Sequence, residues 1–385
     1  MDLLLDAEEQ SVASLAREVL DNLATPGLAR ETETNPLGYS ADLWREIARL
    51  DWIGLCLPGA VGGQDLPLHY AGLLLAEVGR HIAPVPLHST LTAALTVARQ
   101  GRAGQVEALL PGVISGESIM TVAFQEGRTA RSRNGLRTVA VRDGDEYVIT
   151  GVKHFVDNFA AADSCVVSCA DGQGVGLFVV PAVAPGISST PLVTLAKDQQ
   201  SKVAFDHVRV PASALLGEPG EGRSAAEAMI DLGTALLCAQ LAGASRRDAE
   251  FAVDYSRNRV AFGRPIGAFQ SIQHLAADML IAVDGVDLLT REALWRLGAG
   301  LTGAIEVSQA KAFASEKCVF VARSSQQVHG GIGFMMEFDL HLWYRRVVAW
   351  SMRYGTAAEH RARIAAALLD TPGPVRLGMD QVLPS

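Results

Sequence analysis

The spacing of apolar residues changes twice along this chain, and no other feature constrains its fold as strongly. In residues 8–116 apolar side chains recur every three or four positions, which is the helical period. In residues 118–217 they alternate in short runs rich in Val and Phe, as in half-buried strands. In residues 223–369 the helical period returns. This order predicts an α+β protein with three parts: an N-terminal helical domain (1–117), a middle antiparallel β-barrel or sandwich domain (118–222) and a C-terminal four-helix bundle (223–385).

The expected helices differ in length between the two helical domains. The first domain carries four amphipathic segments, at 11–24, 41–55, 70–82 and 87–100. In the last domain the segment 224–258 is long enough for about eight helical turns. Further long segments cover 276–297 and 302–329, which suits antiparallel helices in a bundle.

Composition excludes several classes of protein. The chain has 385 residues, of which 49% are hydrophobic, so it can bury a large core. Its net charge of -9 and its lack of basic runs argue against nucleic acid as a partner. The N-terminus is acidic where a signal peptide would be basic, and no apolar run approaches about 20 residues. We therefore expect a cytoplasmic protein without a membrane partner.

The five cysteines favour a structural role over a chemical one. Cys56, Cys165, Cys169, Cys238 and Cys318 are odd in number and have no CxxC spacing. No histidine lies beside Cys165 and Cys169 in the sequence. We expect reduced core cysteines and no metal site.

Two distant stretches combine an arginine, a phenylalanine, glutamines and a diglycine with helical apolar residues. They read YSRNRVAFGRPIGAFQSIQHLAADM (255–279) and QVHGGIGFMMEFDLHLWYRR (327–346). Together they resemble the flavin-binding sequences of the acyl-CoA dehydrogenase family. Residues 43–63, 151–158 and 205–222 are also similar to stretches of that family, so the resemblance covers nearly the whole chain. It implies the acyl-CoA dehydrogenase fold.

The resemblance implies an enzyme that uses FAD. Family members remove a proton next to the thioester carbonyl of an acyl-CoA, while a hydride leaves the neighbouring carbon for FAD. This forms an enoyl-CoA and requires a carboxylate base. The implied partners are acyl-CoA, a homologous subunit and an electron-acceptor flavoprotein.

The flavin of the family lies across a subunit interface, and the resemblance assigns residues to its ADP half on the neighbouring chain. Arg259 would bind the pyrophosphate, and Phe262 would lie against the adenine. Gln270 and Gln327 would donate hydrogen bonds. The remaining cofactor-binding residues implied are Gly330 and Gly331, which let backbone approach phosphate, and Thr356.

The side that would hold this chain's own flavin ring departs from the family pattern. Residues 123–133 keep Glu126 but lack the usual proline and Ser-Asp pair, and they add Arg128, Arg131 and Arg133. Phe155 stands where a tryptophan is common. Asp157 replaces a threonine that contacts the reactive edge of the flavin, and an anion there should disfavour hydride acceptance.

The catalytic glutamate is absent from both of its usual positions. One position is occupied by Tyr354 and the other by Gly233. Tyrosine is a poor base because its pKa of about 10 keeps it neutral at pH 7. The substitutes considered are Glu359, Asp231 and Glu337, and none stands at a position where the family places its base. We therefore assign no catalytic residue to this chain.

These losses fall on one side of the site only, which predicts a role within a heteromer. Groups for this chain's own flavin ring are eroded, whereas groups for a neighbour's ADP half are intact. Some bacterial family members, including those acting on steroid side-chain CoA thioesters, are heterotetramers that have lost half of their flavin sites. Two alternatives stay open: a homo-oligomeric dehydrogenase with an unusual base, and a flavin monooxygenase that uses His154 or Tyr354.

Overall fold

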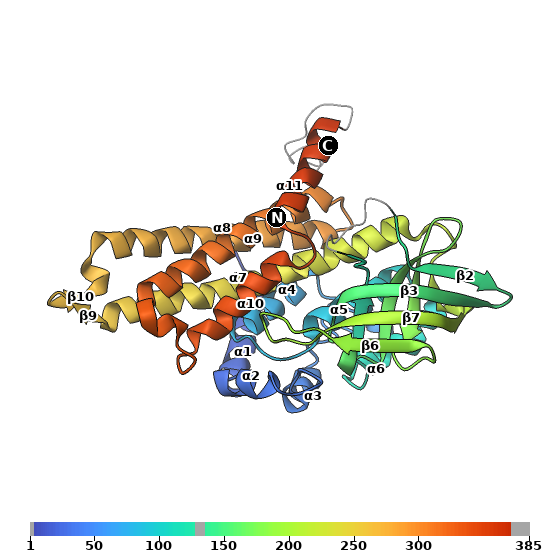
Figure 1. The fold of residues 1–385 in the computed structure, drawn as a ribbon, viewed down its shortest axis with the longest axis horizontal. Helices are drawn as coiled ribbons and strands as arrows, with labels where there is room; N and C mark the ends of the chain where they lie inside the picture. Colours follow the sequence, from blue (N-terminus) through green and yellow to red (C-terminus); the bar gives the residue numbers. More distant parts are fainter. Residues whose placement is uncertain (1–3, 128–134, 371–385) are drawn as a thin grey trace.

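The computed structural model describes residues 4–127 and 135–370, and it begins with a compact group of helices (Figure 1). Their bounds are α1 (Ala7–Leu23), α2 (Pro26–Thr32), α3 (Ala41–Arg49), α4 (His69–Arg80), α5 (Leu87–Gln100) and α6 (Ala103–Ile114). The four expected segments are confirmed as α1, α3, α4 and α5. Helices α2 and α6 were not predicted, because α2 has seven residues and α6 contains an internal proline, Pro111.

An eight-stranded sheet follows. Its strands are β1 (Met120–Ala123), β2 (Val139–Asp143), β3 (Glu146–Asp157), β4 (Ser164–Ala170), β5 (Val175–Pro181), β6 (Ile187–Pro191), β7 (Gln200–Pro211) and β8 (Leu215–Leu216). The order is β6-β7-β3-β2-β4-β5-β8, with β1 beside β4. Most pairs are antiparallel as predicted, but β1 and β2 both pair with β4 in parallel. The sheet is therefore mixed, which alternation alone cannot reveal, because both kinds of pairing share the period of two.

The C-terminal region is built around one long central helix, α7 (Gly222–Asn258). It has 37 residues, two more than the expected segment 224–258, and it packs on α4 and α5 as well as on its own bundle. The remaining elements are the short strands β9 (Val260–Ala261) and β10 (Arg264–Pro265) and the helices α8 (Gln270–Gly298), α9 (Ala304–His329), α10 (Leu340–Met352) and α11 (Ala357–Ala365). Figure 1 shows α7, α8, α9 and α10 lying side by side, with β9 and β10 at their far end.

Close backbone contact joins the first helices to the bundle. A Cβ on Gly243 of α7 would lie 1.7 Å from the carbonyl oxygen of Ala76 on α4. A Cβ on Gly79 of α4 would lie 1.9 Å from the carbonyl oxygen of Gln240 on α7. Only glycine permits this approach. One apolar core consequently runs from α1 through α7 to α10.

Helix α7 is the one described helix that is long and apolar enough to cross a membrane by length and composition. Its most apolar window is 94% buried inside the structure, as in the core helix of a folded domain. The sequence had suggested no such run. The helix is apolar on all sides because it is packed on all sides.

Candidate functional site

The two positions that would carry the base lie in direct contact. Gly233 is buried in the middle of α7, and the ring of Tyr354, from the turn between α10 and α11, packs against it. A Cβ on Gly233 would lie 2.4 Å from Cε1 of Tyr354 and 3.0 Å from Cγ2 of Thr92. The tyrosine ring therefore fills the space into which a side chain at position 233 would extend.

Aromatic groups surround the Tyr354 ring. Its centroid lies 5.0 Å from that of Phe124 and 5.4 Å from that of His88, the latter edge-to-face. The Tyr354 hydroxyl is buried and forms no hydrogen bond of normal geometry within the described residues, although Thr92 faces it. Burial raises the pKa of this hydroxyl far above its usual value. Tyr354 is consequently neutral and cannot accept the proton of a substrate.

His88 approaches the same glycine from α5. Its Nε2 lies 2.9 Å from the carbonyl oxygen of Gly233, so Nε2 carries the proton and donates it. Burial lowers the pKa of His88, which keeps the imidazole neutral. This contact commits its Nε2–H to the backbone of α7.

Hydrogen bonds from α9 and α11 hold the turn that carries Tyr354. Lys311 of α9 is fully buried and donates hydrogen bonds to the carbonyl oxygens of Trp350 (3.3 Å) and Ser351 (2.8 Å), at the end of α10. His360 of α11 donates to the carbonyl oxygen of Tyr354 at 3.0 Å. Tyr354 itself has a φ of 58°, which is unusual for a bulky residue. These contacts fix the ring in its inward position.

Arg353 neutralises the aspartate that was expected to repel a reduced flavin. Its Nη1 lies 3.1 Å from Oδ1 of Asp157, and its Nη2 binds both carboxylate oxygens of Asp198 at 2.6 and 2.7 Å. Gln200 also donates to Asp157 at 2.7 Å. The structure changes the earlier interpretation, because the Asp157 charge is paired with the guanidinium of Arg353.

Little open space is left beside these groups. The cavity lined by His88, Asp157, Asn158 and Arg353 has a volume of about 70 Å³. Small-molecule sites typically have volumes of roughly 300–1,000 Å³. Larger hollows of about 410 Å³, between α1, α4 and α8, and about 800 Å³, between α6 and the sheet, contain none of the predicted site residues.

The substitute carboxylates have other partners. Asp231 binds Arg363 through both oxygens, with Oδ2 2.7 Å from Nη2. Glu359 accepts a hydrogen bond from the Thr356 hydroxyl at 2.9 Å, within the capping box that begins α11. Thr356 therefore has a local structural role, and its predicted role in FAD binding is untested. Glu337 lies on the exposed loop before α10.

Glu126, kept from the family pattern, belongs to a buried ion pair. It accepts from Lys153 at 2.6 Å, both side chains being almost fully buried, and from the backbone N–H of Thr138 at 2.9 Å. Burial would raise the pKa of Glu126, but the charge of Lys153 lowers it. Arg128, Arg131 and Arg133 lie outside the described residues.

The six residues predicted for the ADP half gather at the far end of the bundle. Arg259 directly follows α7, Gln270 begins α8, and Gln327 lies in the last turn of α9. The ring of Tyr255 lies 4.4 Å from that of His329, which brings the ends of α7 and α9 together. All six residues are exposed: Arg259, Phe262, Gln270, Gln327, Gly330 and Gly331.

Backbone conformation at this end suits contact with an anionic, aromatic group. Gly330 has φ 62° and ψ -139°, which is open almost only to glycine. A Cβ on Gly330 or Gly331 would meet no described atom within 4 Å, so another group can approach. Phe262 has a φ of 52° and is 94% exposed, in the turn between β9 and β10. An exposed phenylalanine held in this conformation is costly unless another molecule covers it.

The bundle end fits part of FAD, whereas the region around Tyr354 and Arg353 does not. The bundle end offers an arginine, glutamine amides, open glycine backbone and an aromatic ring, as the ADP half requires. The region of Tyr354 and Arg353 is filled by this chain's own side chains and does not fit a flavin ring with an acyl group. Sequence reasoning missed His88, Thr92, Arg353 and Asp198, because their contacts depend on tertiary structure and leave no local pattern.

Comparison with known proteins agrees with this fold. Models of the acyl-CoA dehydrogenase N-terminal, middle and C-terminal domains match residues 6–117, 125–208 and 220–369. Probable acyl-CoA dehydrogenase YngJ of Bacillus subtilis is 25% identical, over 96% of this chain and 100% of its own length. The chain belongs to the acyl-CoA dehydrogenase family, whose members are FAD-dependent oxidoreductases.

Two solved structures are similar along nearly their whole length. The Tcur3481-Tcur3483 steroid ACAD, in a variant form, is 32% identical with a TM-score of 0.87, covering 94% of this chain and 98% of that chain. The ChsE4-ChsE5 complex from Mycobacterium tuberculosis is 26% identical with a TM-score of 0.90, covering 97% of this chain and 100% of that chain.

Proposed function

We propose that this chain is the non-catalytic subunit of a heteromeric FAD-dependent acyl-CoA dehydrogenase. Its bundle end completes the flavin site of a homologous partner chain, which supplies the base. FAD, when bound there, accepts the hydride during formation of the enoyl-CoA. The observation that carries the proposal is the packing of Tyr354 on Gly233, because it removes both base positions and closes the space between them.

The charges near Tyr354 support the same function. An active site for acyl-CoA needs room for the thioester next to a flavin and a base. Here Arg353, Asp157 and Asp198 form a closed ion-pair group, and the adjoining cavity is only about 70 Å³. The monooxygenase alternative also needs an open pocket, so this arrangement disfavours it. The homo-oligomeric alternative needs a free carboxylate, and Asp231 and Glu359 are both engaged.

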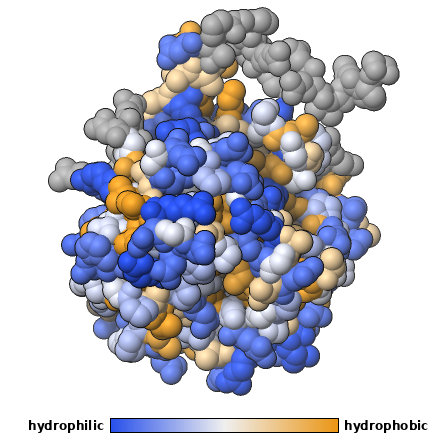
Figure 2. Space-filling view, turned by 90° about the vertical axis from the view of Figure 1, so that its right-hand side faces the viewer, coloured by the Kyte–Doolittle hydropathy of each residue, from blue (hydrophilic) through white to orange (hydrophobic). Residues whose placement is uncertain are grey.

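The distribution of exposed apolar side chains supports contact of the bundle end with another chain. Figure 2, which looks onto the opposite, β-domain side, shows a largely hydrophilic face with small scattered apolar areas. At the bundle end several large apolar side chains are 43–94% exposed: Val260, Phe262, Ile332, Phe334, Met335 and Met336. These side chains lie on two segments, 260–262 and 332–336, and large exposed apolar side chains are typical of interaction surfaces.

Of the two similar structures, one is the ChsE4-ChsE5 complex and the other is the Tcur3481-Tcur3483 steroid ACAD. By analogy we propose a homologous acyl-CoA dehydrogenase subunit as partner, a lipid or steroid CoA thioester as substrate of the complex, and an electron-transferring flavoprotein as acceptor.

Activity measurements test this function. The purified chain should not dehydrogenate acyl-CoA with a dye acceptor, whereas its complex with a homologous chain that retains a family glutamate should. Replacing that glutamate by glutamine in the partner should abolish the activity of the complex. Turnover by this chain alone would contradict the proposal.

A further inference from the structure

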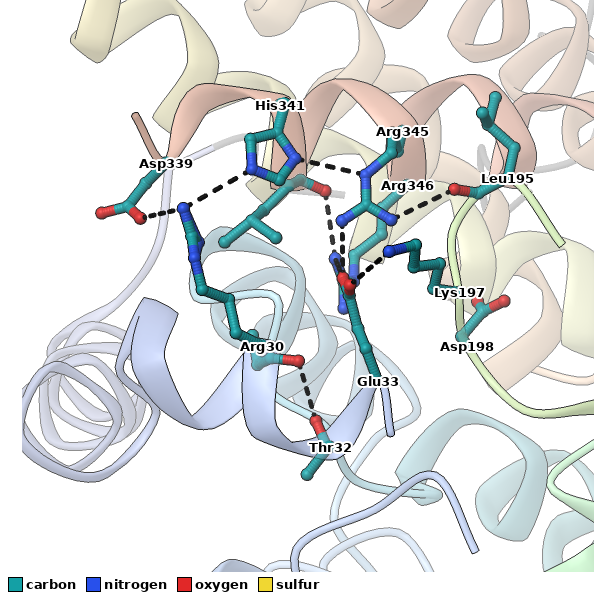
Figure 3. Close-up of polar contacts among 12 residues, drawn as sticks. Arg30, Thr32, Glu33, Leu195, Lys197, Asp198, Asp339, His341, Arg345 and Arg346 are labelled. Carbon is teal, nitrogen blue, oxygen red and sulfur yellow. Dashed lines mark hydrogen bonds and ion pairs between the residues drawn. The ribbon is translucent and has the colours of Figure 1, made fainter. Parts of the chain in front are cut away.

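Arg30 connects the first helical domain to the loop that follows the diglycine (Figure 3). It lies on α2, and its Nη2 donates to the carbonyl oxygen of Met336 at 2.8 Å. The same nitrogen lies 3.0 Å from Oδ1 of Asp339, the residue before α10. One guanidinium from α2 thus binds both the middle and the end of the loop 330–339.

His341 binds the same carbonyl, beside Arg30. Its Nε2 lies 3.2 Å from the Met336 oxygen, and its Nδ1 lies 3.3 Å from Nε of Arg345. Because a carbonyl only accepts, Nε2 carries the proton and Nδ1 accepts from Arg345. Burial and the charge of Arg345 lower the pKa of His341, consistent with a neutral ring.

Glu33, which follows α2, anchors this arrangement to all three parts of the chain. Its side chain is 8% exposed and lies 2.6 Å from Nη2 of Arg345 on α10. Lys197, from the segment before β7, lies 3.5 Å from the same carboxylate, and Arg346 lies 3.4 Å from it. Figure 3 shows these side chains converging on Glu33 next to Arg30 and His341. The end of α2 is therefore fixed against α10.

The first half of this loop is the short 3-10 helix η5 (Gly330–Phe334). After it, among the described residues, the Met335 amide donates to Ile332 at 3.1 Å and the Phe338 amide donates to Met335 at 3.2 Å. The side chains of Phe334, Met335 and Met336 are exposed and contribute little burial of their own. The contacts of Met336 and Asp339 with Arg30 therefore add to the stability of the second half of the loop.

We infer that Arg30, supported by Glu33, is a positioning residue for a nucleotide-contact loop, residues 330–339, which meets the pyrophosphate and adenine half of a partner's FAD. This inference rests on the proposed function, because that function assigns Gly330 and Gly331 to the flavin of the partner. Arg30 touches the loop through Met336 and Asp339 and touches no residue predicted to bind FAD. It acts by holding the loop in its binding conformation before FAD arrives, which lowers the entropic cost of binding.

Hydrogen exchange on the full-length chain tests the positioning role directly. In Arg30→Ala the amides of Met335 and Phe338 should exchange faster by about tenfold or more, since a charge-assisted bond holds the loop. Arg45→Ala is the matched control, because Arg45 is an exposed arginine that pairs only with Asp42 on its own helix among the described residues. Glu33→Gln should give a smaller increase at the same amides. Unchanged exchange in Arg30→Ala would overturn the inference.

FAD retention by the assembled complex provides the second measurement. Arg30→Ala should lower retention several-fold, and Arg259→Ala should lower it without accelerating exchange at Met335. Faster exchange in Arg30→Ala with unchanged FAD retention would also overturn the inference, because the loop would then not be positioned for FAD. If the wild-type complex bound no FAD, the proposed function would fail, whatever the exchange of the loop.

Discussion

The ring of Tyr354 occupies the space that a side chain on Gly233 would need, with Cε1 only 2.4 Å from an ideal Cβ at that position. The two residues are far apart in sequence, yet each stands at a position where the acyl-CoA dehydrogenase family can place its base. The loss of one glutamate is therefore coupled to the loss of the other, because the tyrosine requires the glycine. A glutamate cannot be restored at position 233 without displacing the ring of Tyr354.

Substitutions at both positions should show this coupling. Gly233→Ala should lower the free energy of unfolding by about 1–3 kcal/mol, because the added methyl group overpacks the site. In a Tyr354→Ala background the same change should cost much less, since the ring that it meets is gone. Denaturant unfolding of the two single variants and the double variant measures this coupling. Additive effects would mean that the two residues do not constrain each other.

Tyr354→Phe should leave the activity of the native complex nearly unaltered. The hydroxyl is buried without a hydrogen bond of normal geometry, so its removal should leave stability unchanged or slightly raised. If Tyr354 were the base, turnover should fall by about a hundredfold or more. Steady-state kinetics at normal flavin content distinguish these results.

Arg259→Ala should weaken FAD retention by the complex. A charge-assisted contact with phosphate contributes roughly 1.5–3 kcal/mol, which corresponds to a loss of affinity of about tenfold to a hundredfold. Arg257 is the control, because it is an exposed arginine in the last turn of α7, two residues before Arg259. Flavin absorbance after gel filtration measures retention. Equal flavin content in both variants would remove Arg259 from the site.

Asp248 should make the stability of the chain depend on pH. Its carboxyl group is fully buried on α7, with neither oxygen hydrogen-bonded to a described residue, and burial raises its pKa well above the usual value. The folded state therefore keeps a proton that the unfolded state releases near pH 4. Its contribution to stability is fully present below that pH and declines as pH rises toward the folded pKa, by up to about 1.4 kcal/mol per pH unit.

Asp248→Asn removes this titration and should flatten the dependence. Urea unfolding should be measured at pH 5 and pH 7 at one chain concentration. The free energy of unfolding of the variant, relative to that of the wild-type chain, should be higher at pH 7 than at pH 5. The difference in free energy of unfolding between the wild-type chain and Asp248→Asn could instead be the same at pH 5 and pH 7. That result would show that Asp248 is charged in the folded state.

The architecture was predictable from the sequence because each part has its own apolar period. Helices α1, α3, α4 and α5 follow directly from that pattern. The parallel pairing of β1 with β4 could not be predicted, because strand direction depends on how the chain crosses the sheet. Helix α7 covers the expected segment 224–258 and begins only two residues earlier.

The candidate site was predictable in composition but not in arrangement. The gathering of Arg259, Gln327 and Gly330 at one end of the bundle follows from helix lengths and connections. The pairing of Asp157 with Arg353 was missed, because no fixed sequence separation relates charged residues that come from different domains. The same reason hid Arg30, which is 306 residues from the carbonyl it binds.

The amount of FAD bound per chain tests the heteromeric function most directly. This chain should be purified alone and as a complex with its glutamate-bearing homologue, and flavin absorbance should be compared with the protein concentration of each sample. The filled space at Tyr354 and the open bundle end predict almost no FAD on the chain alone and one FAD for every two chains in the complex. One FAD per subunit on the chain alone, reduced on addition of an acyl-CoA, would contradict the proposed function and would require a base that lies elsewhere in this sequence.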